Sequence, residues 1–208
     1  MESRERIIKA AIEVFAEKGK YGMRMDEIAE RANINKAMVY YYYSSRENLY
    51  REVLESVMRR YFTMLSSAIE QIINDNTDHV DKLRRFVITS LDVLSHDRIV
   101  AKLVIDALAS EPEELSRVME NLKKDPKLNI PKKMLDFLED GMEKGIFRKL
   151  NPKQLLINIV AMSLFYFIAK PVATVFLDLD IEDEQAFLKE RQQSVIELLL
   201  DGIVKRSA

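Results

Sequence analysis

The residues best suited to chemistry lie in one short stretch, where four tyrosines follow one another at positions 40–43 in the run NINKAMVYYYYSS. A helix turns by about 100° per residue, so four successive rings point in different directions and one core face cannot bury them all. A phenol hydroxyl can hydrogen-bond a phosphate while its ring packs on neighbouring side chains. The run therefore predicts that some of these rings contact a partner outside the core.

Helical spacing divides the run into a buried and an exposed face. Val39 and Tyr43 are four residues apart and fall on the side toward the preceding helices, which predicts that both belong to the core. Lys36, Ala37 and Tyr41 fall away from that side, on a face that a DNA major groove can receive. Two further phenols flank this face at positions suited to phosphate contacts, Tyr40 and Tyr42.

Enzyme chemistry has weaker candidates. His79 and His96 each follow an aspartate by four residues, Asp75 and Asp92, a spacing that can hold one face of a metal site. Asp75 and His79 fall at an expected helix break, however, and solvation at helix ends is the simpler interpretation of both histidines. The chain has no cysteine, no Gly-rich phosphate loop and no serine elbow. We therefore expect no enzyme activity, no cofactor and no metal site.

The composition indicates an all-α fold. The 208 residues are 48% hydrophobic, contain only 5 Gly and 5 Pro, and show no alternating strand pattern. The absence of cysteine and of an apolar N-terminal segment favours a cytoplasmic protein. The net charge of −2 does not exclude nucleic acid as a partner: the first 48 residues hold nine Lys and Arg against eight Asp and Glu, and the remainder hold 23 against 26.

Three short helices must position the tyrosine run. The apolar spacing predicts helices over about 3–18 and 25–32, and Gly19 supplies a stop. Asn33 suits the left-handed turn that follows, and Asn35 can cap a helix over 36–43. Two short helices joined by a turn of about three residues indicate a helix-turn-helix.

The remaining chain is also predicted to be helical. Ser44-Ser-Arg-Glu47 matches a capping box, with Ser44 as the cap of a long helix that runs to about residue 74. The apolar segment 155–177 is interrupted by Asn158, Lys170 and Pro171, so core and subunit contact are a better interpretation than a membrane span. Further helices are expected at 79–95, 98–109, 111–123, 131–144, 152–177 and 182–205.

The first fifty residues resemble the N-terminal domain of the TetR family of transcriptional repressors. The matching pieces are RIIKAAIEVFAEKG (6–19) and MDEIAERANINKAMVYYYYSSRENL (25–49), above all VYYYY followed by Ser-Arg-Glu-x-Leu. The resemblance implies that Lys36, Ala37 and Tyr41 approach DNA bases. It also implies that three residues hold the DNA backbone, Tyr40, Tyr42 and Arg46.

This sequence departs from the family pattern at several positions. Arg46 stands where the family usually has Lys, at the start of a helix whose positive dipole end also favours phosphate. Met23 and Arg24 stand where Thr or Ser is usual, and Arg24 can replace the lost phosphate contact by its charge. Asn33 and Ala37 stand where Gly is usual.

The family resemblance and the apolar patterns together predict two domains, a DNA-binding domain at 1–48 and an effector-binding and dimerisation domain at 49–208. Two recognition helices must lie one DNA turn apart, about 34 Å, so a homodimer through helices near 152–177 and 182–205 is expected. The apolar residues that suit this interface are Leu155, Leu156, Ile159, Val160, Met162, Leu164, Phe187, Val195, Ile196, Leu198 and Leu199.

The resemblance also implies a small-molecule effector, bound among the helices of residues 50–145, that releases a palindromic operator. The apolar residues available to line its cavity favour an apolar effector, and they are Phe62, Met64, Phe86, Met119, Met134, Phe137, Phe147, Phe165 and Tyr166. The alternative is a helical module that binds DNA without sequence choice, or binds another protein, and has no effector. No membrane partner is expected.

Overall fold

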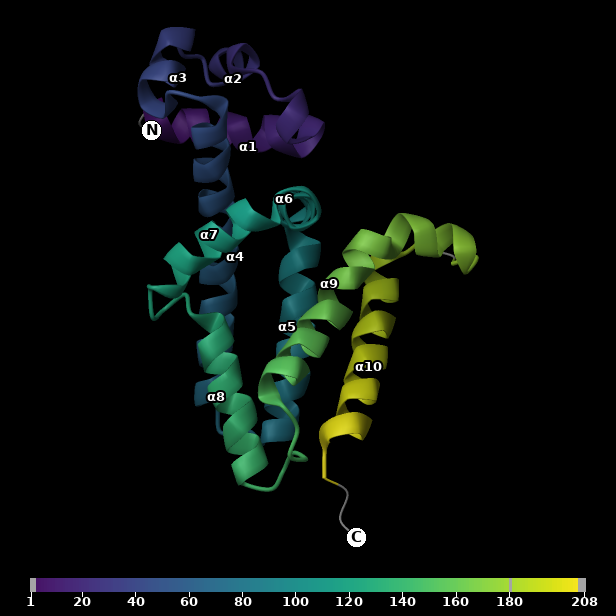
Figure 1. Ribbon diagram of the computed structural model, residues 1–208. Coiled ribbons are helices and arrows are strands. Elements are labelled where there is room, and N and C mark those ends of the chain that lie inside the picture. Colours follow the sequence, from purple (N-terminus) through teal and green to yellow (C-terminus); the bar gives the residue numbers. More distant parts are fainter. Residues whose placement is uncertain (1–2, 180, 206–208) are drawn as a thin grey trace. The chain divides into compact units, whose positions relative to one another are not determined.

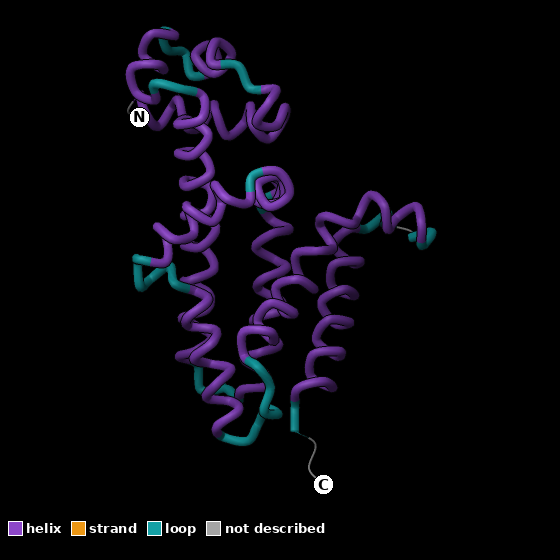
Figure 2. Tube along the Cα trace, in the orientation of Figure 1, coloured by secondary structure: helices purple, strands orange, loops and turns teal. Residues whose placement is uncertain are grey.

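The computed structural model describes residues 3–179 and 181–205 (Figure 1). Within these residues the fold is all-α, as predicted (Figure 2). Phe147 and Val204 form one isolated antiparallel bridge. The helices are α1 (Ser3–Gly22), α2 (Met25–Arg31), α3 (Lys36–Tyr43), α4 (Arg46–Asn74), α5 (His79–His96), α6 (Arg98–Ser110), α7 (Pro112–Lys123), α8 (Ile130–Glu143), α9 (Pro152–Phe176) and α10 (Glu184–Ile203).

The chain folds into two compact units. The first comprises residues 1–62 and 97–128, and the second comprises residues 63–96 and 129–208. Helix α4 runs through the boundary, and α6 and α7 belong to the same unit as α1 to α3. The predicted functional boundary at residue 48 stays a prediction, because packing alone does not show where one function ends and another begins.

In the first unit, α1 packs against α2 and α6, and α2 packs against α3. The predicted apolar stripe of α1 is buried, including Ile7, Val14 and Phe15. Gly19 adopts φ +67°, which breaks the helical conformation before a last turn that ends at Gly22. The predicted stop at Gly19 is therefore a kink between two helical segments.

The start of α4 corrects one prediction. Ser44 adopts φ +55° and closes the end of α3, so it is unavailable as the cap of the next helix. The Oγ of Ser45 instead accepts a hydrogen bond from the amide of Asn48 at 3.1 Å. The cap falls one residue later than predicted because Ser44 has to reverse the chain. Glu47 is then only two residues after the cap, whereas the capping box needs a Glu or Gln three residues after it.

In the second unit, α5 packs against α9 and α10, and α9 also packs against α8 and α10. An aromatic cluster joins α5, α8 and the segment that follows α8, and its rings are those of His79, Phe86, Phe137 and Phe147. Gly141 on α8 lies so close to Phe147 that an added Cβ would stand 2.3 Å from the ring. This glycine is therefore required by a close contact rather than by a turn.

His96 is exposed at the last residue of α5, as predicted, but His79 departs from the prediction of solvation at helix ends. His79 Nε2 lies 2.6 Å from Asp140 Oδ2, its side chain is mostly buried, and its ring stacks on Phe137. His96 Nδ1 lies 2.7 Å from the carbonyl oxygen of Asp92. Asp75 is paired with Arg85 instead of His79. Among the described residues, no group of three or more His, Asp or Glu side chains is arranged to hold a metal ion.

The dimer interface predicted on α9 and α10 agrees only in part with the burial of their apolar residues. Its apolar residues surround the helix, and it is long and apolar enough to cross a membrane by length and composition, which a subunit-contacting helix also satisfies. Five residues predicted for the interface are instead buried within the second unit, Leu155, Ile159, Val195, Ile196 and Leu199. The apolar side chains that α9 leaves exposed are Ile157, Val160, Phe165, Ile168, Val172, Val175 and Phe176.

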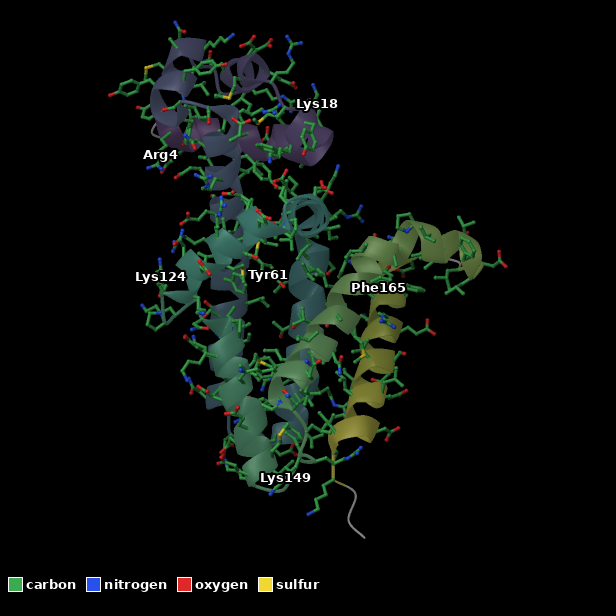
Figure 3. The ribbon with its side chains drawn as sticks, viewed as in Figure 1. Arg4, Lys18, Tyr61, Lys124, Lys149 and Phe165 are labelled. Atoms are coloured by element: carbon green, nitrogen blue, oxygen red, sulfur yellow. The ribbon has the colours of Figure 1, made fainter. Side chains whose placement is uncertain are left out.

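Two residues predicted to line an effector cavity also lie on the surface. Met64 is exposed on α4, and Phe165 is 63% exposed. Phe165 lies on α9 (Figure 3). Six of the predicted lining residues are buried, as a lining or core residue must be, and they are Phe62, Phe86, Met134, Phe137, Phe147 and Tyr166. These residues were predicted from their apolar type, and residue type alone does not separate buried positions from exposed ones.

Candidate DNA-binding site

Local hydrogen bonds hold α3 in position. The side chain of Asn35 accepts a hydrogen bond from the Ala37 amide at 2.9 Å, which confirms the predicted cap. Asn33 adopts φ +50°, as its place in the turn predicted. Arg6 of α1 donates to the Asn33 carbonyl oxygen at 3.2 Å, so the turn between α2 and α3 is held against α1.

The faces of α3 are as the helical spacing predicted. Val39 and Tyr43 are buried in the core of the first unit. Tyr41 points away from them and is 79% exposed, and Lys36 and Ala37 are also exposed. The two flanking phenols are partly exposed, Tyr40 at 43% and Tyr42 at 40%. The structure therefore presents all five of the candidate side chains on α3 to solvent.

Met38 is a further exposed residue of α3 for which no role is predicted. Its side chain is exposed on α3, beside the face that carries Tyr41. At about 100° per residue, Met38 and Tyr41 are separated by about 60° around the helix, close enough to share one binding surface. The spacing alone was sufficient to include Met38 with Ala37 on this face.

Lys36 is not a free cation in the unbound protein. Its Nζ lies 2.5 Å from Asp26 Oδ1 on α2 and 5.8 Å from the centroid of the Tyr40 ring. The hydrogen bond to Asp26 raises the pKa of Lys36, with a further contribution from the carboxylate charge. Lys36 is thus charged and oriented toward α2 before any ligand arrives.

The two predicted arginines lie at helix starts. Arg24 is exposed and directly precedes the first residue of α2, and Arg46 is the first residue of α4. Arg46 Nε lies 3.5 Å from Glu47 Oε1, a weak surface pair that leaves part of the guanidinium accessible. Met23 is buried, so it is a core residue and cannot contact a phosphate.

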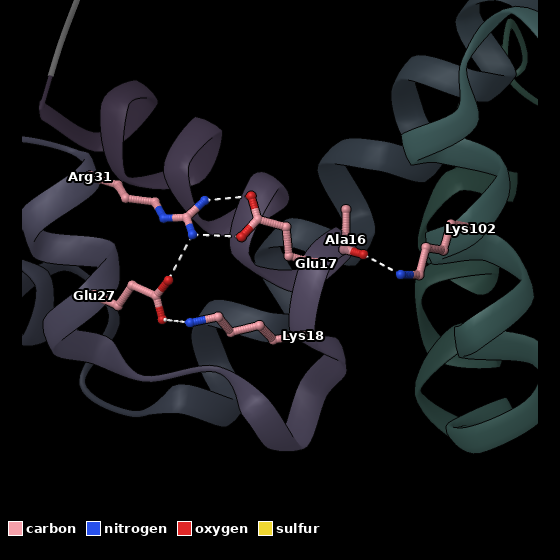
Figure 4. A network of polar contacts seen from close by, with 6 residues as sticks. All are labelled: Ala16, Glu17, Lys18, Glu27, Arg31 and Lys102. Carbon is pink, nitrogen blue, oxygen red and sulfur yellow. Dashed lines mark hydrogen bonds and ion pairs between the residues drawn. The ribbon is translucent and has the colours of Figure 1, made fainter.

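A network of ion pairs joins α1 to α2 (Figure 4). The two terminal nitrogens of Arg31 donate to the two carboxylate oxygens of Glu17 at 2.7 and 2.6 Å, and one of them also donates to Glu27 at 2.8 Å. Lys18 donates to the other oxygen of Glu27 at 2.7 Å. Since α2 carries the turn into α3, this network also fixes the direction of α3 relative to α1.

Lys102 of α6 joins α1 by donating a hydrogen bond to the Ala16 carbonyl oxygen (Figure 4).

Taken together, a capped exposed helix, a preceding short helix and a fixed turn define a helix-turn-helix DNA-binding protein.

Comparison with known proteins assigns the family. The profile described as "Bacterial regulatory proteins, tetR family" matches residues 7–53, and the profile described as "Tetracyclin repressor-like, C-terminal domain" matches residues 79–199. The chain belongs to the TetR family of transcriptional regulators, which confirms the family that the sequence resembled. Its relatives are regulators of transcription rather than enzymes.

The curated relatives include both repressors and activators. The chain is 28% identical over 188 residues to the transcriptional repressor NicS of Pseudomonas putida, covering 88% of this chain and 84% of NicS. It is 33% identical over 118 residues to the transcriptional activator FasR of Mycolicibacterium smegmatis, covering 56% of this chain and only 52% of FasR. The family therefore leaves the direction of regulation open.

Solved structures show the same fold. The TetR family regulator PfmR of Thermus thermophilus aligns with a TM-score of 0.67 at 19% identity, over 97% of this chain and 100% of PfmR.

Proposed function

We propose that the protein recognises a specific palindromic operator as a homodimer and represses transcription until a small molecule releases it. The observation that carries the first part is the exposure of Tyr41 on α3 while Val39 and Tyr43 are buried. Lys36, Ala37 and Tyr41 read base edges in the major groove. Ala37 is small, so the helix backbone can approach the bases closely.

The phosphates on either side of the groove are held by four residues that surround α3, namely Arg24, Tyr40, Tyr42 and Arg46. The two arginines add charge at the positive ends of α2 and α4, where an anion is already favoured. The two phenols supply hydroxyl donors beside the base-reading face. This division gives the arginines a role in affinity and the exposed centre of α3 a role in specificity.

The homodimer forms through the exposed apolar surface of α9, together with Leu198 of α10. A surface with this many large apolar side chains is unusual for a monomer and typical of an interface between subunits. Phe165, Val172 and Phe176 are the central residues of the proposed contact. The dimer places two α3 helices one DNA turn apart, about 34 Å.

The effector binds in the interior of the second unit, against α9 and α10. Two buried polar atoms there have no hydrogen-bond partner among the described residues, the hydroxyl of Tyr166 and Nε of Arg191. An unpartnered buried polar group is costly, so each favours a ligand that supplies the missing bond. We therefore expect a largely apolar effector with at least one polar atom.

Selection of bound fragments from random duplex DNA tests this proposal. A specific operator reader should enrich a sequence with two half-sites and bind it at least ~10³-fold more tightly than random DNA. A protein that coats DNA without choice should enrich nothing and show only steep salt dependence. Retention of every duplex with equal affinity, or of none at low salt, would exclude specific recognition. We place this activity in the cytoplasm, where operator DNA is accessible.

A further inference from the structure

A hollow of about 250 Å³ lies within the first unit, between the end of α1, the N-terminal part of α4 and the end of α6. Its apolar wall is formed by Phe15, Val53, Leu54 and Leu103. Its polar lining comes from Lys18, Lys20, Tyr21, Tyr50, Asp106, Ser110 and Glu111. None of these residues is among the proposed DNA contacts, and only Lys18 takes part in the ion-pair network between α1 and α2.

Lys20 indicates what chemistry this hollow accommodates. Its Nζ lies 2.5 Å from Glu111 Oε1, 4.9 Å from the centroid of the Tyr50 ring and 5.9 Å from that of Tyr21. An ammonium held between aromatic faces and a carboxylate is the arrangement by which proteins bind organic cations. The ammonium group of Lys20 thus already occupies the position where an organic cation would contact these rings and Glu111.

The lining also offers an unused negative charge. The side chain of Asp106 is half-buried and has no hydrogen bond or ion pair among the described residues. Both lining lysines are already paired, Lys20 as above and Lys18 with Glu27 at 2.7 Å. An incoming anion would have to break one of these pairs, whereas an incoming cation would gain a partner in Asp106.

The electrostatics of Tyr50 point in the same direction. Burial raises the pKa of its phenol to about 12, and the negative charges of Glu111, Asp106 and Glu114 contribute to the increase. The carboxylates of Asp106 and Glu111 thus lie near enough to Tyr50 for their charges to act on its phenol.

We propose that this hollow is a binding site for a compact aliphatic ammonium ion, with Asp106 as its counter-ion and the rings of Tyr50 and Tyr21 as its cation-binding faces. Drug-sized ligands occupy pockets of about 300–1,000 Å³, so this smaller hollow suits a ligand of only a few heavy atoms. A short diamine can place one ammonium at Asp106 and compete with Lys20 for Glu111. The bound ligand lies directly against α1.

Calorimetric titration of the full chain at low salt tests the site, with 1,4-diaminobutane as the probe. The matched probes are 1,4-butanediol, which is neutral, and succinate, which is an anion of similar length. We expect saturable binding of one diamine per chain and no binding of the other two. No saturable diamine binding by either the parent or Lys20→Met would overturn the proposal.

Two substitutions locate the bound probe. Asp106→Asn removes the counter-ion and should weaken diamine binding by about tenfold. Lys20→Met removes the tethered competing ammonium, whose effective concentration is about millimolar or higher, and should tighten binding. A purely structural role for Lys20 predicts the opposite sign. Binding that is unchanged in Asp106→Asn would show that the diamine lies elsewhere.

Glu113→Gln is the matched control, because it removes one exposed carboxylate from α7 in the same unit without altering the lining. Glu113→Gln should bind the diamine with the affinity of the parent. If it weakens binding as much as Asp106→Asn does, the effect of Asp106→Asn arises from the loss of net charge and not from a contact with the diamine. Circular dichroism and thermal unfolding check that each variant is folded. These titrations contain no DNA, so their outcome is independent of the operator-binding proposal.

Discussion

Lys36 of α3 and Asp26 of α2 form an ion pair at 2.5 Å on the surface proposed to enter the major groove. DNA must replace this carboxylate with its own acceptors, and the carboxylate repels nearby phosphates. Asp26→Asn should therefore strengthen DNA binding by up to about fivefold, the range expected for an exposed ion pair. Fluorescence anisotropy with labelled operator measures the change.

The control for this substitution is Asp136→Asn, which breaks a similar surface pair with Lys132 on α8. It should leave DNA affinity unchanged. Weaker operator binding by Asp26→Asn would mean that Asp26 is needed to orient Lys36, and the proposed competition would then be wrong.

Tyr41 and Arg46 should give different signatures because one is proposed to read bases and the other to hold phosphate. Tyr41→Ala should relax the preference at one operator position by about 1–3 kcal/mol. Arg46→Ala should weaken binding to all sequences alike and reduce the salt slope by about one unit. Binding measured on a set of single-base operator variants at several salt concentrations separates the two. If both variants bind like the parent, α3 does not enter the groove as proposed.

The exposed side chain of Phe165 tests the dimer. Phe165→Glu places a charge in the proposed apolar contact and should convert the dimer to monomers, because an unpaired buried charge is strongly unfavourable. Sedimentation velocity measures the mass in solution. Lys189→Glu, an exposed charge reversal on α10, is the control and should remain dimeric. A dimer that persists in Phe165→Glu would place the interface on another surface.

Gly141 and Phe147 provide a test of packing in the second unit. The methyl group added by Gly141→Ala has no room beside the buried Phe147 ring, so we expect a loss of about 1–3 kcal/mol in the free energy of unfolding. Phe147→Leu removes the ring atoms that clash and should reduce the cost of the alanine. Urea unfolding of both single variants and the double variant measures the coupling, and additive losses would contradict the contact.

The ion-pair network of Arg31 between α1 and α2 should make the stability of the protein depend on pH. Its hydrogen bond lowers the pKa of Glu17, and hydrogen bonds from Lys18 and then Arg31 lower the pKa of Glu27. Both carboxylates therefore stabilise the fold at pH values above their ordinary pKa of about 4.5. This contribution is lost as the pH falls through the lower pKa values that Glu17 and Glu27 have in the folded protein. Arg31→Met should make stability less dependent on pH between about 5 and 3.

Thermal unfolding across that pH range measures this effect. Arg117→Met, which breaks an exposed pair with Glu114 on α7, is the control because it leaves the joint between α1 and α2 intact. An acid-induced loss of stability that is as steep in Arg31→Met as in the parent would show that the network contributes nothing to pH dependence.

The sequence by itself determined the helices and the faces of α3. Helix ends depend on local groups such as the Asn35 cap and the left-handed Asn33, and an exposed face follows from spacing once Val39 and Tyr43 are assigned to the core. These signals lie within a few residues of one another, so no knowledge of the distant chain was required. Two local predictions were corrected. The stop at Gly19 is a kink within α1, and the cap of α4 is Ser45 instead of Ser44, where two adjacent helices compete for the same residues.

Only the tertiary structure decided which apolar residues of α9 face the core and which charged groups meet. A helix with apolar residues on every side has no periodic signal that separates the buried Ile159 from the exposed Phe165. His79 and Asp140, or Lys20 and Glu111, are far apart along the chain, and their pairing depends on how whole helices pack. Local spacing carries no information about such contacts, because they are fixed by the burial of surfaces from separate segments.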